Sequence, residues 1–384
     1  MSEHMKVMLA GISSLILTLG IARFSYTPLL HIMQEQTSLN DAIGGWLAAF
    51  NYTGYLSGAI IAASINNLKL KDTLYRYGLI MAVITTIGMA WTENWMIWAV
   101  LRYLAGLSSA AGLLLGSGLI LNWLIRHGYK MELGIHFAGL GLGIALTAIA
   151  VELMLLKFNW AEQWLVFALI GLLFIFPAWF WLPRPDGSDT TKQGESLIDK
   201  PPSRNWMRLL SASYFCAGVG YVINATFIVV IIDSQPELNG YGNWAWLVIG
   251  LVGAPSCIFW DRVTRKLGEF NSFILAYALQ IFSILLLAFD VSVLMLFLCA
   301  GIYGVTVFGI VSMMLTMAGK LYPTKPAKLM GKVSLYYALA QIIAPAIGGS
   351  VAEVTGNYSI VLIASAIIMI AGLAMLIKLM KIPQ

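Results

Sequence analysis

Long apolar runs recur along the whole of this chain and limit what it can fold into. A helix needs about 20 apolar residues to cross the hydrocarbon core of a bilayer. Twelve segments approach or exceed that length, near residues 7–29, 43–66, 75–92, 96–125, 131–156, 160–182, 208–233, 242–260, 271–289, 291–319, 332–355 and 358–378. Only 11% of the residues are charged, against about 25% in a soluble domain. We therefore predict an all-α membrane protein with twelve transmembrane helices, which excludes a soluble enzyme.

The connections between these segments predict how the chain is divided and oriented. Residues 183–207 are polar and rich in proline, so we expect a cytoplasmic linker between two six-helix halves, 1–182 and 208–384. With a cytoplasmic N-terminus, the cytoplasmic segments hold all 23 Lys and Arg residues except Arg23, Arg102 and Lys157. This excess satisfies the positive-inside rule. It predicts a multi-pass protein with both termini in the cytoplasm.

The two halves resemble each other weakly. Gly20 in the first apolar segment has a counterpart in Gly220, and the pair Trp46–Leu47 has one in Trp246–Leu247, both 200 residues further on. These offsets favour a parallel duplication of a six-helix unit. Transporters built in this way bind their substrate between the two repeats.

Several short motifs resemble those of a known superfamily. WDRVTRKLG (Trp260–Gly268) is similar to a loop motif that members of the major facilitator superfamily carry between helices 8 and 9, and RYLAGLSSAAG, from Arg102, to their fourth-helix motif. GIARFSYTPLLHIM, FAGLGLGI and GYVINATF resemble the YbfB/YjiJ-type branch. The resemblance implies the major facilitator fold, transport by alternating access, and the inner (cytoplasmic) membrane of a bacterium. It also implies that Asp261, Arg262 and Arg265 form a cytoplasmic gate.

Two arginines lie inside apolar segments. Arg23 is surrounded by leucine, isoleucine and phenylalanine in the first segment, and Arg102 lies in the fourth. A cation in the hydrocarbon costs about 2.5–3.5 kcal/mol on insertion scales. The resemblance places both helices beside a central cavity, where two guanidiniums would bind a carboxylate or phosphate. The alternative is that each arginine is a structural ion pair or extends to the interface.

The sequence offers few candidates for proton coupling. Acidic residues are missing from the middle of the apolar segments, but Glu152 lies at about the depth of the two arginines and could neutralise one of them. Its alternative is a solvated helix end near Lys157. His136, five residues into the fifth segment, is a second candidate, although a packing role is favoured. Further polar residues within segments are candidate substrate contacts: Asn51, Tyr52, Tyr221, Asn224, Tyr337 and Gln341.

These observations favour a secondary active transporter of a small organic anion, working with proton coupling or by exchange. Proton-driven efflux of drugs or metabolites is the alternative, and a non-transporting membrane sensor is a more distant one. The three cysteines lack metal-ligand spacing and the glycine runs follow no strand. We therefore expect no metal and no cofactor. The expected partners are a small-molecule substrate, the lipid bilayer and protons, with no nucleic acid, and we expect a monomer.

Overall fold

The structure is a computed structural model of the chain. It describes residues 1–39, 41–155, 157–185, 196–233, 235–238, 240–289, 292–355 and 358–382. Every regular element in these residues is a helix. The prediction of an all-α protein is therefore confirmed.

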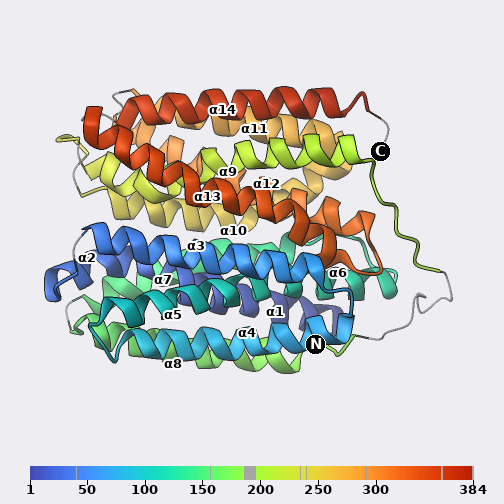
Figure 1. The fold of residues 1–384 in the computed structure, drawn as a ribbon, viewed down its shortest axis with the longest axis horizontal. Helices are drawn as coiled ribbons and strands as arrows, with labels where there is room; N and C mark the ends of the chain where they lie inside the picture. Colours follow the sequence, from blue (N-terminus) through green and yellow to red (C-terminus); the bar gives the residue numbers. More distant parts are fainter. Residues whose placement is uncertain are drawn as a thin grey trace.

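The helices form two groups. The first comprises α1 (Glu3–Leu15), the π-helix η1 (Ile16–Phe24), α2 (Tyr26–Gln36), α3 (Asp41–Ser64), α4 (Leu68–Met89), α5 (Trp95–Ala110), the π-helix η2 (Ala111–Gly116), α6 (Ser117–Arg126), α7 (Gly134–Met154) and α8 (Trp160–Phe180). The second comprises α9 (Arg204–Asp233), α10 (Gly242–Leu267), α11 (Glu269–Leu287), α12 (Val293–Leu321), α13 (Pro326–Thr355) and α14 (Tyr358–Leu379). Figure 1 shows the groups side by side, with both chain ends at the same end of the bundle. The exact boundaries 1–182 and 208–384 remain a prediction.

Nine helices in the described residues are long and apolar enough to cross a membrane. Three other helices, α3, α4 and α13, are 24, 22 and 30 residues long, which corresponds to about 33–45 Å. Of these, α3 and α4 fall outside the nine because they are more polar, with charged side chains at the start of α4 and amide and tyrosine side chains in α3. The membrane-spanning character is established, and the count of twelve spans remains a prediction.

Two expected spans are continuous but change helix type. The first runs through α1, η1 and α2, and the fourth through α5, η2 and α6. In η1 the amide of Ser25 donates to the carbonyl of Gly20 at 3.0 Å, so the repeat is five residues instead of four. Such π segments inside α-helices frequently occur at functional sites. The first of them carries Arg23.

Glycines in α7 allow this helix to pack closely on both sides. A Cβ on Gly143 would lie 2.8 Å from the Cα of Gly20 in η1, and one on Gly141 would lie 2.6 Å from the carbonyl oxygen of Gly250 in α10. Real Cβ atoms do not approach other atoms so closely. The glycine run therefore brings α7 against its own group on one face and against the second group on the other.

Candidate functional site

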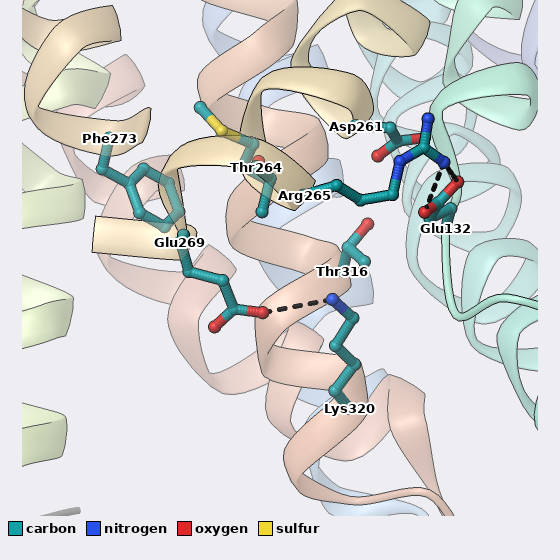
Figure 2. Close-up of a pocket in the computed structure, with 10 residues that line it drawn as sticks. Glu132, Asp261, Thr264, Arg265, Glu269, Phe273, Thr316 and Lys320 are labelled. Carbon is teal, nitrogen blue, oxygen red and sulfur yellow. Dashed lines mark hydrogen bonds and ion pairs between the residues drawn. The ribbon is translucent and has the colours of Figure 1, made fainter. Parts of the chain in front are cut away.

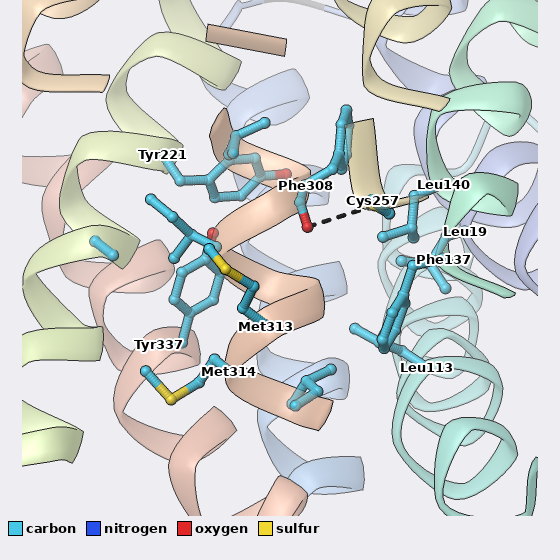
Figure 3. Close-up of a cluster of buried hydrophobic side chains, with 14 of the residues drawn as sticks. Leu19, Leu113, Phe137, Leu140, Tyr221, Cys257, Phe308, Met313, Met314 and Tyr337 are labelled. Atoms are coloured by element: carbon cyan, nitrogen blue, oxygen red, sulfur yellow. Dashed lines mark hydrogen bonds between the residues drawn. The ribbon is translucent and has the colours of Figure 1, made fainter. Parts of the chain in front are cut away.

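A central cavity lies where the two helix groups meet. Its volume is about 40 Å³, and the side chains in its lining that carry polar groups are Arg23, Tyr55, Tyr214, Tyr221, Tyr337 and Gln341. Figure 3 shows Tyr221 and Tyr337 on one side of this interior and Leu19, Leu113 and Leu140 on the other. A water molecule takes about 30 Å³ in the liquid, whereas small-molecule sites take about 300–1,000 Å³. The cavity therefore has space for about one water molecule and is much smaller than a small-molecule site.

Arg23 brings the charge into this cavity. Its side chain is only 6% exposed, and its Cζ lies 4.9 Å from the ring centre of Tyr52 and 5.2 Å from that of Tyr55. No described residue forms an ion pair or a side-chain hydrogen bond with its guanidinium. Cation–π contacts contribute about 0.5–2 kcal/mol each and offset part of the cost of burial. The positive charge itself has no counter-charge among the described residues.

Arg102 contacts the segment that carries Arg23. Its guanidinium donates to the carbonyl of Ala22 at 3.1 Å and to that of Arg23 at 3.5 Å, and its Cζ lies 4.2 Å from the ring centre of Tyr26. The hydroxyl of Ser109 likewise donates to the carbonyl of Thr18 at 2.8 Å. These donors from α5 hydrogen-bond the carbonyls of η1. The structure thus places Arg102 behind Arg23, outside the lining of the cavity.

The other predicted contacts divide into two sets. Tyr221, Tyr337 and Gln341 line the cavity, and Tyr52 lies beside Arg23. The remaining two residues lie elsewhere. The amide of Asn51 donates to the carbonyl of Arg102 at 2.9 Å and joins α3 to α5, and Asn224 is directed to Gly220 of its own helix at 3.5 Å.

The two residues considered for coupling lie away from the cavity lining. Glu152 is exposed, and no described residue forms an ion pair with it. The structure therefore does not bring it together with Arg23 or Arg102. His136 is completely buried, and its Nε2 lies 2.8 Å from the hydroxyl of Ser117. This contact joins α7 to α6.

The predicted gate residues lie at the seam between the groups, beside a second pocket of about 190 Å³. Figure 2 shows Arg265 of α10 reaching Glu132, with a shortest distance of 2.7 Å. Asp261 accepts a hydrogen bond from the backbone amide of Gly134 at 2.7 Å. A carboxylate at this position compensates the N-terminal dipole of α7. Arg262 is exposed, and no described residue forms an ion pair or a hydrogen bond with its side chain.

Other contacts close the same end of the molecule. The amide of Asn122 in α6 donates to the carbonyl of Pro323, between α12 and α13, at 2.9 Å. A Cβ on Gly118 would lie 2.8 Å from the amide nitrogen of Ala327 in α13. The two groups are thus in direct contact on the side of the gate.

Sequence reasoning missed three residues of these sites. Tyr55 lies one turn after Tyr52, and Tyr214 lies two turns before Tyr221, so helical periodicity could have identified both. Glu132 precedes a helix start and meets Arg265 only in the folded chain. No pattern in the sequence indicates that Glu132 and Arg265 form an ion pair.

The comparisons with known proteins agree with this geometry. A family model described as "Uncharacterised MFS-type transporter YbfB" matches residues 15–376. The uncharacterised MFS-type transporter YceJ of Bacillus subtilis (strain 168) is 22% identical over 275 residues, which cover 68% of this chain and 67% of that protein. The crystal structure of the human organic anion transporter MFSD10 (TETRAN) has a TM-score of 0.76 at 16% identity and covers 98% of this chain and 100% of its own. This chain therefore belongs to the YbfB-type transporters of the major facilitator superfamily.

Proposed function

We propose that this transporter exchanges small organic anions and that Arg23 binds their negative charge. The observation that carries the proposal is the burial of Arg23 in the cavity between the two groups without a protein counter-charge among the described residues. A guanidinium donates two parallel hydrogen bonds to a carboxylate. The human transporter that shares the fold is described as an organic anion transporter, which supports a substrate of this charge.

Exchange is favoured over proton coupling for a physical reason. Alternating access requires the cavity to close around its contents, and closure around an unpaired cation removes water that stabilises the charge. A bound anion offsets this penalty, so the loaded carrier changes state more readily than the empty one. A proton carrier would need a titratable group beside Arg23, whereas Glu152 is exposed and His136 lies outside the lining.

The positive charge of the cavity also argues against the efflux of cationic drugs. Proton-driven efflux of cationic drugs would need a membrane-buried acid, and the lining of the described cavity contains none. We further propose that the protein lies in the cytoplasmic membrane of a bacterium as a monomer, with both termini inside. The closed gate then faces the cytoplasm.

The proposal is tested with purified protein in liposomes loaded with an unlabelled carboxylate. We expect uptake of labelled external carboxylate to require the internal anion and to respond little to an imposed pH gradient. Arg23→Gln should abolish uptake. Arg23→Lys should retain only part of it, because an ammonium group lacks the planar fork of a guanidinium.

Glu152→Gln is the matched control, since it removes a charge from an exposed position. We expect this variant to exchange anions at the wild-type rate. Uptake driven by a pH gradient into empty liposomes, and lost in Glu152→Gln, would contradict exchange and restore proton coupling.

A further inference from the structure

A column of three tyrosine rings borders the same cavity as Arg23. Tyr214 and Tyr221 come from α9 and Tyr337 comes from α13. The ring centre of Tyr337 lies 4.4 Å from that of Tyr214 and 5.7 Å from that of Tyr221, with planes inclined by 24° and 21°. All three side chains are more than nine-tenths buried. Tyr337 is the middle ring, so its two faces are covered, and a further flat ring can stack only on an outer face of the end rings, Tyr214 or Tyr221.

The cavity is also lined by an amide whose oxygen has no partner. Gln341 lies one turn after Tyr337 on α13, lines the cavity and is 3% exposed. Its Oε1 has no hydrogen-bond partner, and no described residue forms a hydrogen bond with either end of the amide. Buried polar groups are nearly always paired. A ligand that donates a hydrogen bond would satisfy this oxygen.

We infer that the transported anion is an aromatic monocarboxylate with a hydrogen-bond donor on its ring. The inference rests on the proposed function, because it assigns the carboxylate to Arg23. The ring packs on the tyrosine column, and its hydroxyl or amino substituent donates to Gln341.

The single positive charge in the cavity lining favours a ligand with a single negative charge. Arg23 is the single charged side chain in the described lining. A dicarboxylate or a phosphate dianion would leave its second charge without a partner in an apolar site, which is strongly unfavourable. The aromatic side chains Phe24 and Phe308 also line the cavity and favour a flat, apolar body on the ligand.

The direction of loading follows from the closed gate. A volume of about 40 Å³ is too small for an aromatic acid, so the groups must separate to admit one. Contacts such as Asn122 to Pro323 and Gly134 to Asp261 hold them together on the gate side. The acid therefore enters from the opposite end of the bundle.

The test measures binding to the purified full-length protein by calorimetry with three probes: benzoate, 4-hydroxybenzoate and cyclohexanecarboxylate. Benzoate and cyclohexanecarboxylate have the same charge and similar size, but the saturated ring is more hydrophobic and cannot stack. We expect benzoate to bind about fivefold more tightly, as a stacked aromatic pair requires. We expect 4-hydroxybenzoate to bind more tightly still.

Variants separate the two contacts. Tyr221→Leu should remove the preference for benzoate, whereas Gln341→Leu should remove only the additional affinity of 4-hydroxybenzoate. Tyr336→Leu is the matched control, because it makes the same substitution at a tyrosine that is 42% exposed and lies outside the cavity lining, and it should keep both preferences. The wild-type comparison of benzoate with cyclohexanecarboxylate needs no variant, so it tests the inference even where Tyr221→Leu does not fold.

Equal affinity for benzoate and cyclohexanecarboxylate, lost in Arg23→Gln, would overturn the aromatic assignment and leave the anion site intact. Carboxylate binding that is unaffected by Arg23→Gln would overturn the proposed function and the inference together.

Discussion

At the scale of single residues, Arg23 and Arg102 both lie inside apolar segments of the sequence, but their environments in the structure differ. Arg23 makes cation–π contacts in the cavity, and Arg102 hydrogen-bonds the backbone of η1. Arg102→Met leaves the carbonyl of Ala22 without its donor. A hydrogen bond to a charged group contributes about 1.5–3 kcal/mol, so we expect the free energy of unfolding to fall by about this amount. Thermal unfolding in detergent measures the change.

The comparison variant is Arg23→Met, which removes no hydrogen bond to a described residue. We expect it to unfold at or above the wild-type temperature while losing anion binding, since replacing an uncompensated buried charge with an apolar side chain is favourable. Equal destabilisation by both substitutions would show that Arg23 also has a structural role.

At the scale of elements, the contact between η1 and α7 depends on the absence of side chains. A Cβ at position 143 would meet the backbone of Gly20, and backbone cannot move aside as a flexible side chain can. Gly143→Ala should therefore force the two helices apart. Overpacking of this kind costs about 1–3 kcal/mol, which would appear as a lower unfolding temperature.

Gly301→Ala provides the control, because Gly301 lies inside α12 and a Cβ there has open space around it. Alanine has a higher helix propensity than glycine by about 1 kcal/mol, so this variant should unfold at the wild-type temperature or slightly above. If Gly143→Ala is as stable as Gly301→Ala, then η1 and α7 can separate enough to accommodate a Cβ without loss of stability.

At the scale of the whole molecule, two polar contacts across the seam differ in strength. The Glu132–Arg265 pair is partly solvated, with side chains 25% and 44% exposed, and such pairs contribute about 0–1 kcal/mol. The hydrogen bond from Gly134 to the Asp261 carboxylate is charge-assisted and contributes about 1.5–3 kcal/mol. Asp261→Ala should therefore raise the population open on the gate side about tenfold or more, and Arg265→Gln should raise it less.

Distances between spin labels at Tyr129 and Lys266, on the two sides of the seam, measure these populations. Asp261→Asn should give an intermediate effect, because it keeps an acceptor oxygen but loses the charge. A larger shift in Arg265→Gln than in Asp261→Ala would show that the ion pair is the stronger contact.

Some features could be predicted because their signals are local. Long apolar runs require helices in a bilayer, and the motif that includes Asp261 and Arg265 is contiguous. The burial of Arg23 could also be predicted, since its neighbours in the sequence are apolar. Periodicity beyond this residue is less informative, because the π segment inserts one residue into the repeat and changes which face each later residue occupies.

The sequence alone determined that this protein is helical and membrane-embedded and that it carries a cation within its first span. Only the tertiary structure decided that Arg102 contacts the backbone of η1, that Glu152 faces outward, and that Tyr214, Tyr221 and Tyr337 stack beside Arg23. The physical reason is that a membrane helix such as α7 is apolar on all sides. Its sequence pattern does not distinguish a lipid-facing side from an inward one, so the rotation of each helix is fixed by packing against distant segments.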